Sequence, residues 1–338
     1  MTKILGIEST CDETGAAVVE DGRIILSNVI ASQEDIHKKY GGIVPEVASR
    51  MHLEALPVVV DEALKNAKVK IDNIDAIAIA KEPGLPPALS VGYGYASGLA
   101  LSKKKPLLEI NHLEAHISGI WLRNKGEIVK EIPYPFLCLV VSGGHTQIHL
   151  VASPETQKVI GRTQDDAAGE AFDKVARMLS LGYPGGPAID KLAREGDEKA
   201  FNFPRPMITS DNFNFSFSGL KTAVKRQVEK LKEDCEEYKG KKKLYKELCK
   251  NWVADTAASF QEAVVEVLVT KTIKAANDLG IQTIAMAGGV SANSRLRDHF
   301  GRVCKDADFD LHYPELKYCI DNAAMIAARG GEIFRNND

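Results

Sequence analysis

The chain begins the same way twice, and this repetition limits its possible folds more than any other feature. Each copy consists of three short apolar segments separated by turn residues such as Asp21-Gly22. Short apolar runs bounded by turn residues are typical of strands. The predicted strands are Lys3–Glu8, Gly15–Val19 and Ile24–Ile30 in the first copy, and Phe136–Val141, Gln147–Ala152 and Lys158–Arg162 in the second.

Each copy is followed by alternating helices and strands. The pattern predicts an α/β fold made from a duplicated ribonuclease-H-like unit, with a cleft between the two halves. Two unrelated three-stranded segments are the alternative. The predicted elements are helices near Pro45–Asn66, Ala88–Lys104, Ala168–Ser180 and Asp255–Leu279, and strands at Ala76–Ala80 and Thr283–Ala287.

Composition narrows the class of protein further. The 338 residues are enough for two domains, and a net charge of −3 argues against a generally basic nucleic-acid-binding surface, although not against a local basic patch. No apolar run approaches the roughly 20 residues of a membrane span. The six cysteines show no C-x-x-C pair, so they are predicted to be thiols. We therefore expect a cytoplasmic protein without membrane contact.

The segment His112-Leu113-Glu114-Ala115-His116 follows a predicted strand, Pro106–Ile110. Two histidines four residues apart lie above one another on a helix, so one metal ion can reach both imidazoles. Two surface histidines without a metal are the alternative interpretation. Strand ends in α/β proteins are common ligand sites, which favours the metal.

A zinc protease with the H-E-x-x-H motif is disfavoured. Such enzymes carry the general-base glutamate directly after the first histidine, where this chain has Leu113. At roughly 100° per residue, Glu114 points about 200° away from His112 and cannot face the same metal. Asp321, before the apolar run Ala323–Ala328, is a candidate third ligand. Its alternative role is to cap the helix that follows.

Glycine-rich turns occur at three places, and no G-x-G-x-x-G or Walker A pattern is found in them. Backbone N–H groups in such turns can approach a phosphate closely, so the turns favour a nucleotide held between two lobes. Asp12 and Glu13, after the first strand, are candidates for a base or an orienting group. The turns are Ser142-Gly143-Gly144, Gly185-Gly186-Pro187 and Gly288-Gly289, and a helix is expected to begin at Ser291-Ala292-Asn293.

Long motifs spread over the whole chain resemble one family. They occur in the order ILGIESTCDETGAAV, GGIVPEVASRMH, NHLEAHI, VSGGHTQ, DDAAGEAFDKVARMLSLGYPGGPAID, FSFSGLKTA, MAGGVSANSRLR and DNAAMIA. The chain is similar to the bacterial type of the tRNA N6-adenosine threonylcarbamoyltransferase (TsaD) family. So many matches in one order make this resemblance specific.

The resemblance implies the fold of actin, Hsp70 chaperones and sugar kinases, with two ribonuclease-H-like lobes around a nucleotide cleft. It also implies transfer of a threonylcarbamoyl group from threonylcarbamoyl-AMP to N6 of adenosine 37 in tRNAs that read codons beginning with A. The metal ligands of the family fall on His112, His116 and Asp321, and the metal is iron first, with zinc as the alternative. Its substrate-binding residues fall on Val140, Val141, Ser142, Gly143, Gly144, Asp173, Gly186, Asp190 and Asn293.

The resemblance also implies partners, namely the anticodon loop of tRNA, a TsaB-like paralogue and a TsaE-like ATPase. Lys103-Lys104-Lys105 and the region from Lys221 to Lys250 are candidate RNA contacts, although a solvated helix face is the alternative for the second. One departure is Pro86-Pro87, where the family usually has small residues; these prolines remove two N–H donors from the loop after Leu85.

We divide the chain into an N-terminal lobe, 1–116, and a C-terminal lobe with helical insertions, 117–320. The last helix, 321–338, is expected to pack back on the N-terminal lobe. Two alternative functions stay open at this stage. Relatives were once described as metal-dependent glycoprotein endopeptidases, and the fold also includes small-molecule kinases. A kinase needs Mg²⁺, whereas a His-His-Asp site suits a softer metal better.

Overall fold

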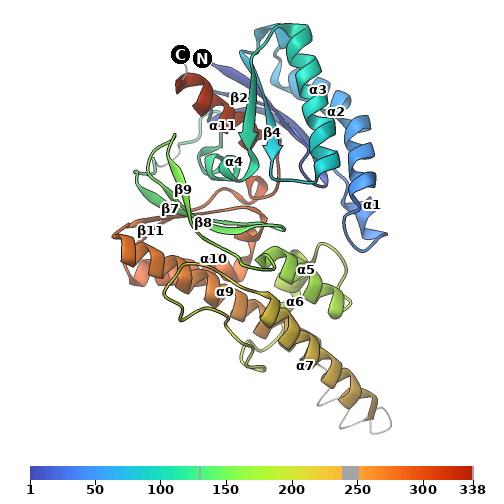
Figure 1. The fold of residues 1–338 in the computed structure, drawn as a ribbon, viewed down its shortest axis with the longest axis vertical. Helices are drawn as coiled ribbons and strands as arrows, with labels where there is room; N and C mark the ends of the chain where they lie inside the picture. Colours follow the sequence, from blue (N-terminus) through green and yellow to red (C-terminus); the bar gives the residue numbers. More distant parts are fainter. Residues whose placement is uncertain (129–130, 238–250, 337–338) are drawn as a thin grey trace.

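The computed structural model describes residues 1–128, 131–237 and 251–336. It contains two β-sheets, one in each half of the chain (Figure 1). The first sheet has the order β5-β4-β1-β2-β3-β6 and the second β11-β10-β7-β8-β9. The strands are β1 (Lys3–Glu8), β2 (Glu13–Glu20), β3 (Ile24–Ser32), β4 (Ala76–Glu82), β5 (Leu107–Asn111), β6 (Arg123–Asn124), β7 (Phe136–Val141), β8 (Thr146–Val151), β9 (Gln157–Arg162), β10 (Thr283–Ala287) and β11 (Asp310–His312).

The two sheets share one topology. In the first sheet, β1 pairs antiparallel with β2 and parallel with β4, and β2 pairs antiparallel with β3. In the second, β7 pairs antiparallel with β8 and parallel with β10, and β8 pairs antiparallel with β9. The shared strand order and directions confirm the predicted duplication of a ribonuclease-H-like unit.

Helices cover both faces of the first sheet. On one face, α2 (Pro45–Ala67) and α3 (Pro86–Lys103) bury an apolar cluster with alternate residues of β1 and β2; the short α1 (Glu34–Lys38) precedes them. On the other face, α11 (Ala323–Asn336) packs on β1, β2 and β4 through its small residues. The end of the chain thus lies on the sheet formed by its beginning (Figure 1). The division at residue 116 stays a prediction.

The second sheet has one large core on the face away from the first lobe. Phe172, Phe215, Phe260 and Phe300 are buried there with residues of β7, β8 and β10. The helices around this core are α5 (Ala168–Met178), α6 (Gly185–Ala193), α7 (Ser218–Glu237), α9 (Trp252–Leu279) and α10 (Ser294–Asp306). Four 3-10 turns complete the described elements, at Ile71–Asn73, Gly119–Trp121, Gly289–Ala292 and Leu316–Tyr318.

The remaining helix, α4 (His112–Ser118), lies between the two sheets (Figure 1). Its apolar residues Leu113 and Ile117 are buried, together with Trp121, against Phe136 and Val140 of β7. Its backbone continues directly from β5 of the first sheet. This small helix therefore links the first sheet to the second, and any side chain on it is positioned by both lobes.

Some predicted boundaries change. The helix expected from residue 291 begins at Ser294, because residues 289–292 form a 3-10 turn and the Asn293 side chain caps α10. Pro86 and Pro87 occupy the first positions of α3, where backbone N–H groups make no hydrogen bond within the helix. Their cost to the loop is therefore smaller than the sequence suggests.

Cysteines and membrane contact can also be compared with the predictions. Four of the cysteines are free thiols, as expected: Cys11, Cys138, Cys304 and Cys319. The prediction is wrong for Cys235, which is disulfide-bonded; widely spaced cysteines give no local sequence pattern for such a bond. Within residues 1–128, 131–237 and 251–336, no helix is both long and apolar enough to cross a membrane.

Candidate functional site

Helix α4 brings His112 and His116 together. The Asn111 side chain caps the helix by accepting hydrogen bonds from the N–H groups of Leu113 and Glu114, at 3.0 and 3.2 Å. One helical turn then places the two imidazoles edge to face, with ring centroids 4.8 Å apart and ring planes at 81°. Both side chains are almost completely buried, at 5% and 2% exposure. Two surface histidines are thus excluded as the interpretation.

Asp321 faces the same two rings from the start of α11. Its Oδ1 lies 3.5 Å from Nε2 of His112 and 3.1 Å from Nε2 of His116. The helix cap is supplied by Asn322, whose Oδ1 accepts a hydrogen bond from Met325 N–H at 3.2 Å. The ligand atoms of the three predicted residues lie within 4.8 Å of one another. Residues more than two hundred positions apart in sequence therefore form one cluster.

Two observations indicate that the cluster can hold a divalent metal. Nε2 of His116 is buried and has no hydrogen-bond partner in the described structure, since its approach to Asp321 lacks hydrogen-bond geometry. A buried polar nitrogen without a partner is costly unless a ligand satisfies it. Two imidazoles and one carboxylate also match the donors that zinc and ferrous iron prefer, whereas magnesium prefers oxygen alone.

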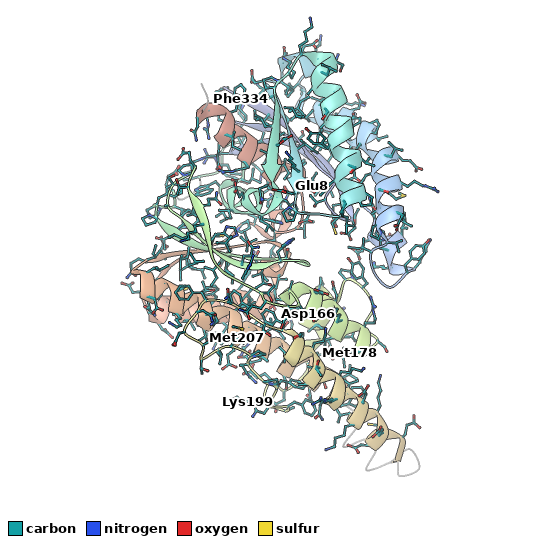
Figure 2. All side chains as sticks on the ribbon, viewed as in Figure 1. Glu8, Asp166, Met178, Lys199, Met207 and Phe334 are labelled. Carbon is teal, nitrogen blue, oxygen red and sulfur yellow. The ribbon has the colours of Figure 1, made fainter. Side chains whose placement is uncertain are left out.

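Glu8 is a residue of the candidate site that the sequence analysis missed. It ends β1, is completely buried, and accepts a hydrogen bond from Nδ1 of His112 at 3.0 Å. Its other oxygen accepts from the N–H of Thr10 at 2.6 Å. Figure 2 shows Glu8 at the end of the first sheet that faces the second lobe. A carboxylate orienting a ligand histidine is the usual outer partner of a metal site. A charged residue closing an apolar strand was the only sequence sign of this role.

The charges of the cluster depend on one another. Burial opposes protonation of His112, but the carboxylates of Glu8 and Asp321 outweigh burial and hold the His112 pKa well above its usual value. Burial likewise favours the neutral acid at Asp321, but His112 and His116 hold the Asp321 pKa well below its usual range. Without a metal, a protonated imidazole thus balances the carboxylates, and a cation would replace that proton.

The turn after β7 is closely approached by two glycines, one at the start of α5 and one after β10. Val140 and Val141 are buried within the strand, whereas Gly143 and Gly144 are exposed. A side chain at Gly169, at the start of α5, would come within 2.4 Å of the Ser142 carbonyl oxygen. A side chain at Gly288, whose φ is +86°, would come within 2.5 Å of the Val141 carbonyl oxygen. Glycine is therefore required for these segments to converge.

The remaining predicted substrate residues lie around the same helices. Asp173 accepts a hydrogen bond from Gly185 N–H at 2.7 Å, beside Gly186, and burial raises its pKa. Asp190 accepts from the Ser294 hydroxyl at 2.8 Å, and the neighbouring Asn293 donates to Gln261 at 2.8 Å. These bonds tie α5 to α6 and α6 to α10. All the predicted residues of this set thus belong to the second sheet and the helices around it.

Asp12 and Glu13 have different environments. Asp12 accepts a hydrogen bond from the Tyr183 hydroxyl at 3.2 Å, which connects the first lobe to the second. Burial, followed by the negative charges of Asp12 and Asp321, raises the pKa of Glu13 to about 10. Glu13 therefore keeps its proton at neutral pH. Of the two residues, only Asp12 suits a base.

The candidate RNA-binding lysines are only partly free. Lys103 and Lys104 are exposed at the end of α3, while Lys105 donates to the Asp72 carbonyl oxygen at 2.8 Å. On α7, Lys221 forms an ion pair with Asp166 and Lys225 pairs with Glu229. Residues 238–250 lie outside the described residues. The described part of α7 therefore fits a solvated helix face better than an RNA contact.

Glu114 faces away from the cluster, as the helix geometry predicts. Its carboxylate pairs with Arg329 of α11 at 2.8 Å, and Arg329 also contacts Glu332 at 3.1 Å. The guanidinium donates further to the carbonyl oxygen of Pro154 in the second lobe, at 2.6 Å. Glu114 therefore has a structural partner, and the endopeptidase alternative lacks its base.

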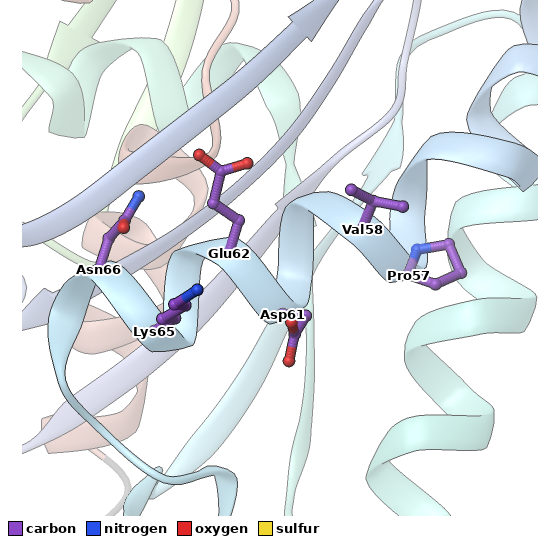
Figure 3. Close-up of a pocket in the computed structure, with 6 residues that line it drawn as sticks. All are labelled: Pro57, Val58, Asp61, Glu62, Lys65 and Asn66. Atoms are coloured by element: carbon purple, nitrogen blue, oxygen red, sulfur yellow. The ribbon is translucent and has the colours of Figure 1, made fainter.

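Two hollows in the described surface differ in their value as sites. One, of about 540 Å³, lies along α2 and is lined by Pro57, Val58, Asp61, Glu62, Lys65 and Asn66. All six belong to one helix (Figure 3), so this hollow is a surface groove away from the cluster. The other, of about 520 Å³, is lined by residues of both lobes, including His145 directly after the exposed glycines.

The fold and the cluster define a class of protein: two ribonuclease-H-like lobes with a metal-binding candidate between them. Solved structures agree on the fold. A full-length HypF in a phosphate- and nucleotide-bound form aligns with a TM-score of 0.61 at 12% identity, over 98% of this chain and 46% of HypF. HypF from T. kodakarensis aligns with a TM-score of 0.64 at 13% identity, over 99% of this chain and 48% of that one. The chain thus spans about half the length of these HypF proteins.

Sequence comparison identifies the family. The family model described as tRNA N6-adenosine threonylcarbamoyltransferase matches residues 24–328. Enzymes of that name are 50% identical in Thermosipho africanus, over 98% of this chain and 94% of the relative, and 51% identical in Clostridium botulinum, over 96% and 90%. This chain belongs to the tRNA N6-adenosine threonylcarbamoyltransferase family, and it is a transferase.

Proposed function

We propose that this protein transfers the threonylcarbamoyl group of threonylcarbamoyl-AMP to N6 of adenosine 37 in tRNAs that read codons beginning with A. The observation that carries the proposal is the buried cluster of His112, His116 and Asp321 at the junction of two lobes in a member of this family. No observation favours a protease or a kinase.

The metal is part of the proposal. His112 and His116 would supply two nitrogens, Asp321 would supply an oxygen, and Glu8 would orient the first imidazole. The open positions suit ferrous iron first and zinc second. When bound, the metal supplies Lewis-acid stabilisation of negative charge on the carbamoyl donor.

The glycine turns of the second lobe are the proposed adenylate site. Exposed backbone N–H groups at Gly143 and Gly144 can donate to phosphate oxygens without a side chain in the way. Val140 and Val141 end the strand β7 before them, and Ser142 begins the turn. Asp173, Gly186, Asp190 and Asn293 form the surrounding wall, where carboxylate and amide groups can bind the ribose and threonine hydroxyls.

The reaction is attack by a weak nucleophile, so positioning carries much of the acceleration. The N6 amine forms a bond to the carbamoyl carbon, the bond from that carbon to the phosphate oxygen breaks, and AMP leaves. One N6 proton must be removed. Asp12 is the proposed acceptor because it is nearly buried at 9% exposure, whereas Glu13 keeps its own proton.

Partners and location follow from the substrate and from the family resemblance. The tRNA anticodon loop must bind across both lobes, with the exposed Lys103 and Lys104 as possible phosphate contacts. A TsaB-like paralogue and a TsaE-like ATPase are the proposed protein partners. Since its proposed substrate is tRNA, we expect the enzyme to act in the cytoplasm. We propose residues 1–116 and 117–320 as its two lobes.

Nucleoside analysis tests the proposal. Unmodified tRNA would be incubated with threonylcarbamoyl-AMP and this protein, with and without the proposed partners, and its nucleosides identified by mass spectrometry. The expected product is N6-threonylcarbamoyladenosine at position 37, together with AMP. Proteolysis of a glycoprotein, or phosphate transfer from ATP to a small molecule, without any modified adenosine would overturn the proposal.

A further inference from the structure

The hollow of about 520 Å³ between the lobes has no assigned role. Its size falls within the range of about 300–1,000 Å³ that is typical of small-molecule sites. Three segments line this open hollow: the end of β4 with the loop before α3, the start of α4, and the β8–β9 hairpin. The lining residues are Glu82, Pro83, Gly84, Leu89, Asn111, Leu113, Glu114, His145, Gln147, His149, Gln157 and Val159.

The hollow borders the reactive groups on two sides. Asn111 and Leu113 line it and flank the ligand residue His112 in the chain. His145 lines it and directly follows the exposed Gly144 of the proposed adenylate site. A molecule in the hollow would therefore lie on the Leu113–Glu114 side of α4, next to the turn that carries the proposed donor site. This position suits a second substrate that approaches the donor from the hairpin side.

The chemistry of the walls favours an uncharged planar molecule. Leu89, Leu113 and Val159 provide apolar surface, and neutral groups provide hydrogen bonds. Burial lowers the pKa of His149 to about 4, so that its ring is neutral at pH 7, and its Nε2 donates to Gln147 at 2.9 Å. Neutral imidazole rings and amide groups are the surfaces on which unstacked nucleobases bind.

One hydrogen-bond acceptor in the walls lacks a partner. The side-chain oxygen of Gln157 is buried and accepts no hydrogen bond from any described residue. An unsatisfied buried oxygen favours a ligand that brings a donor. Gln157 lies on β9, and the neighbouring Val159 pairs with His149 across the two strands. The β8–β9 hairpin thus carries the Gln157 side-chain oxygen and the His149 ring next to each other in the lining of the hollow.

The charge of the hollow excludes an anion. None of the twelve described residues that line it is a lysine or arginine, and two are glutamates, Glu82 and Glu114. Glu114 is balanced by Arg329, but Glu82 is exposed at the rim. A phosphate or the carboxylate of a threonyl group would be repelled here. The pocket therefore suits an uncharged base whose phosphate stays outside it.

We propose that this hollow is the pocket for the acceptor base, and that adenosine 37 of the tRNA inserts its adenine between α4 and the β8–β9 hairpin. The base would leave the anticodon stack to reach the donor, as in other enzymes that act on a nucleobase. This inference rests on the proposed function. The adenine of the adenylate donor is the alternative occupant, but its proposed site is at the glycine turns of the second lobe.

Filling the pocket tests the inference by kinetics. Val159→Trp places a ring in the hollow from an edge strand, at a side chain that is already 41% exposed. At saturating threonylcarbamoyl-AMP, kcat/KM for tRNA should fall by about 100-fold. The inhibition constant of AMP and the bound metal per chain should stay unchanged. Lys158→Trp, on the opposite face of β9, is the matched control and should retain its kcat/KM.

A milder variant guards against misfolding. Gln157→Leu removes the unpartnered acceptor without adding bulk, and kcat/KM for tRNA should fall by about fivefold because one hydrogen bond is lost. Unchanged tRNA kinetics in both variants would overturn the inference. Weaker inhibition by AMP with unchanged tRNA kinetics would also overturn it, because the adenine of the donor would then be the occupant.

A binding measurement separates this inference from the proposed function. An anticodon stem-loop RNA carrying 8-azidoadenosine at position 37 would be irradiated with the full chain, and the labelled peptide identified. The expected label lies on the lining segments 82–89, 111–114 or 145–159, and the same photoreactive base placed in the stem should not label them. This result would support the pocket even if no threonylcarbamoyl transfer occurred. Labelling elsewhere, with transfer intact, would overturn the pocket alone.

Discussion

Glu8 and His112, separated by 104 positions in the chain, form a buried hydrogen bond of 3.0 Å that sets the orientation of the imidazole. Because Nδ1 is engaged by Glu8, Nε2 is the nitrogen that faces Asp321. The end of the first strand of the fold thus determines which nitrogen of His112 is available to a metal. This arrangement makes a test of the metal site possible without changing a ligand.

Glu8→Gln should weaken metal binding while leaving all three ligands in place. The amide keeps the size of the side chain but loses the charge that favours a metal-bound imidazole. Loss of such an outer partner typically lowers metal affinity by about 10- to 100-fold. Competition with a chelator, followed by metal analysis, measures the change. Glu20→Gln, on β2 of the same sheet, is the control and should not alter affinity. Equal affinity in both variants would contradict the role of Glu8.

The metal-free protein should lose stability as pH rises. The folded-state pKa of His112 lies above its unfolded value of about 6.5, so its contribution is full below that pH and disappears as pH rises through the folded pKa. One proton gives a slope of at most about 1.4 kcal/mol per pH unit. Asp321 acts in the opposite sense, since its lowered pKa contributes stability that is lost only in acid.

Urea unfolding of the metal-free protein between pH 6 and pH 9 measures this slope. The stabilisation produced by added metal should grow over the same interval, because the metal competes with the proton on His112. His112→Gln should flatten the pH dependence of the metal-free protein. An unfolding free energy that rises through this interval in the unmodified chain would contradict the predicted charge state.

Arg329 should be important for stability and not for chemistry. Its guanidinium is 8% exposed and pairs with both Glu114 and Glu332. Arg329→Met removes the cation that both carboxylates face, although Glu332 keeps its hydrogen bond from the Ser118 hydroxyl at 2.8 Å. Because Glu114 is about one-third exposed, the cost should be at most about 3 kcal/mol, the lower end for a broken buried pair. Urea unfolding measures the loss. Glu114→Gln should leave the bound metal per chain unchanged, since this carboxylate faces Arg329; loss of bound metal in this variant would return Glu114 to the metal centre.

Asp12→Asn tests the proposed base. The amide oxygen can still accept the hydrogen bond from Tyr183, so the link between the lobes should persist. Removal of a general base typically lowers the rate by about 10²- to 10⁴-fold. We expect kcat to fall in this range while KM for threonylcarbamoyl-AMP changes little. Glu13→Gln should have a smaller effect, because Glu13 already holds a proton. The reverse order would assign the base to Glu13.

Local patterns predicted most of the fold and the ligand set. The repeated strand pattern depends on apolar runs and turn residues, which are set by a few neighbouring residues each. The strand Thr283–Ala287, for example, has the predicted bounds. The spacing of His112 and His116 needs only one helical turn. The role of Asp321 was harder to predict, because its position before a helix also suggested a helix cap. In the structure the neighbouring Asn322 caps that helix.

Relationships between distant segments were beyond local patterns. Glu8 contacts His112 only because the end of β1 and the start of α4 lie at the same edge of the first sheet. The interlobe pocket combines the end of β4, the start of α4 and the β8–β9 hairpin, and none of these segments carries a pocket motif. Family resemblance supplied the substrate residues, but their mutual contacts became visible only in three dimensions.

The most direct test of the account measures metal content and transfer activity on the same samples. Metal-free protein would be titrated with ferrous iron, and separately with zinc, in the presence of tRNA, threonylcarbamoyl-AMP and the proposed partners. The account predicts that modification of adenosine 37 rises with metal and saturates at one ion per chain, and that Asp321→Asn loses both metal and activity. Full activity of the metal-free protein, or of Asp321→Asn, would contradict it.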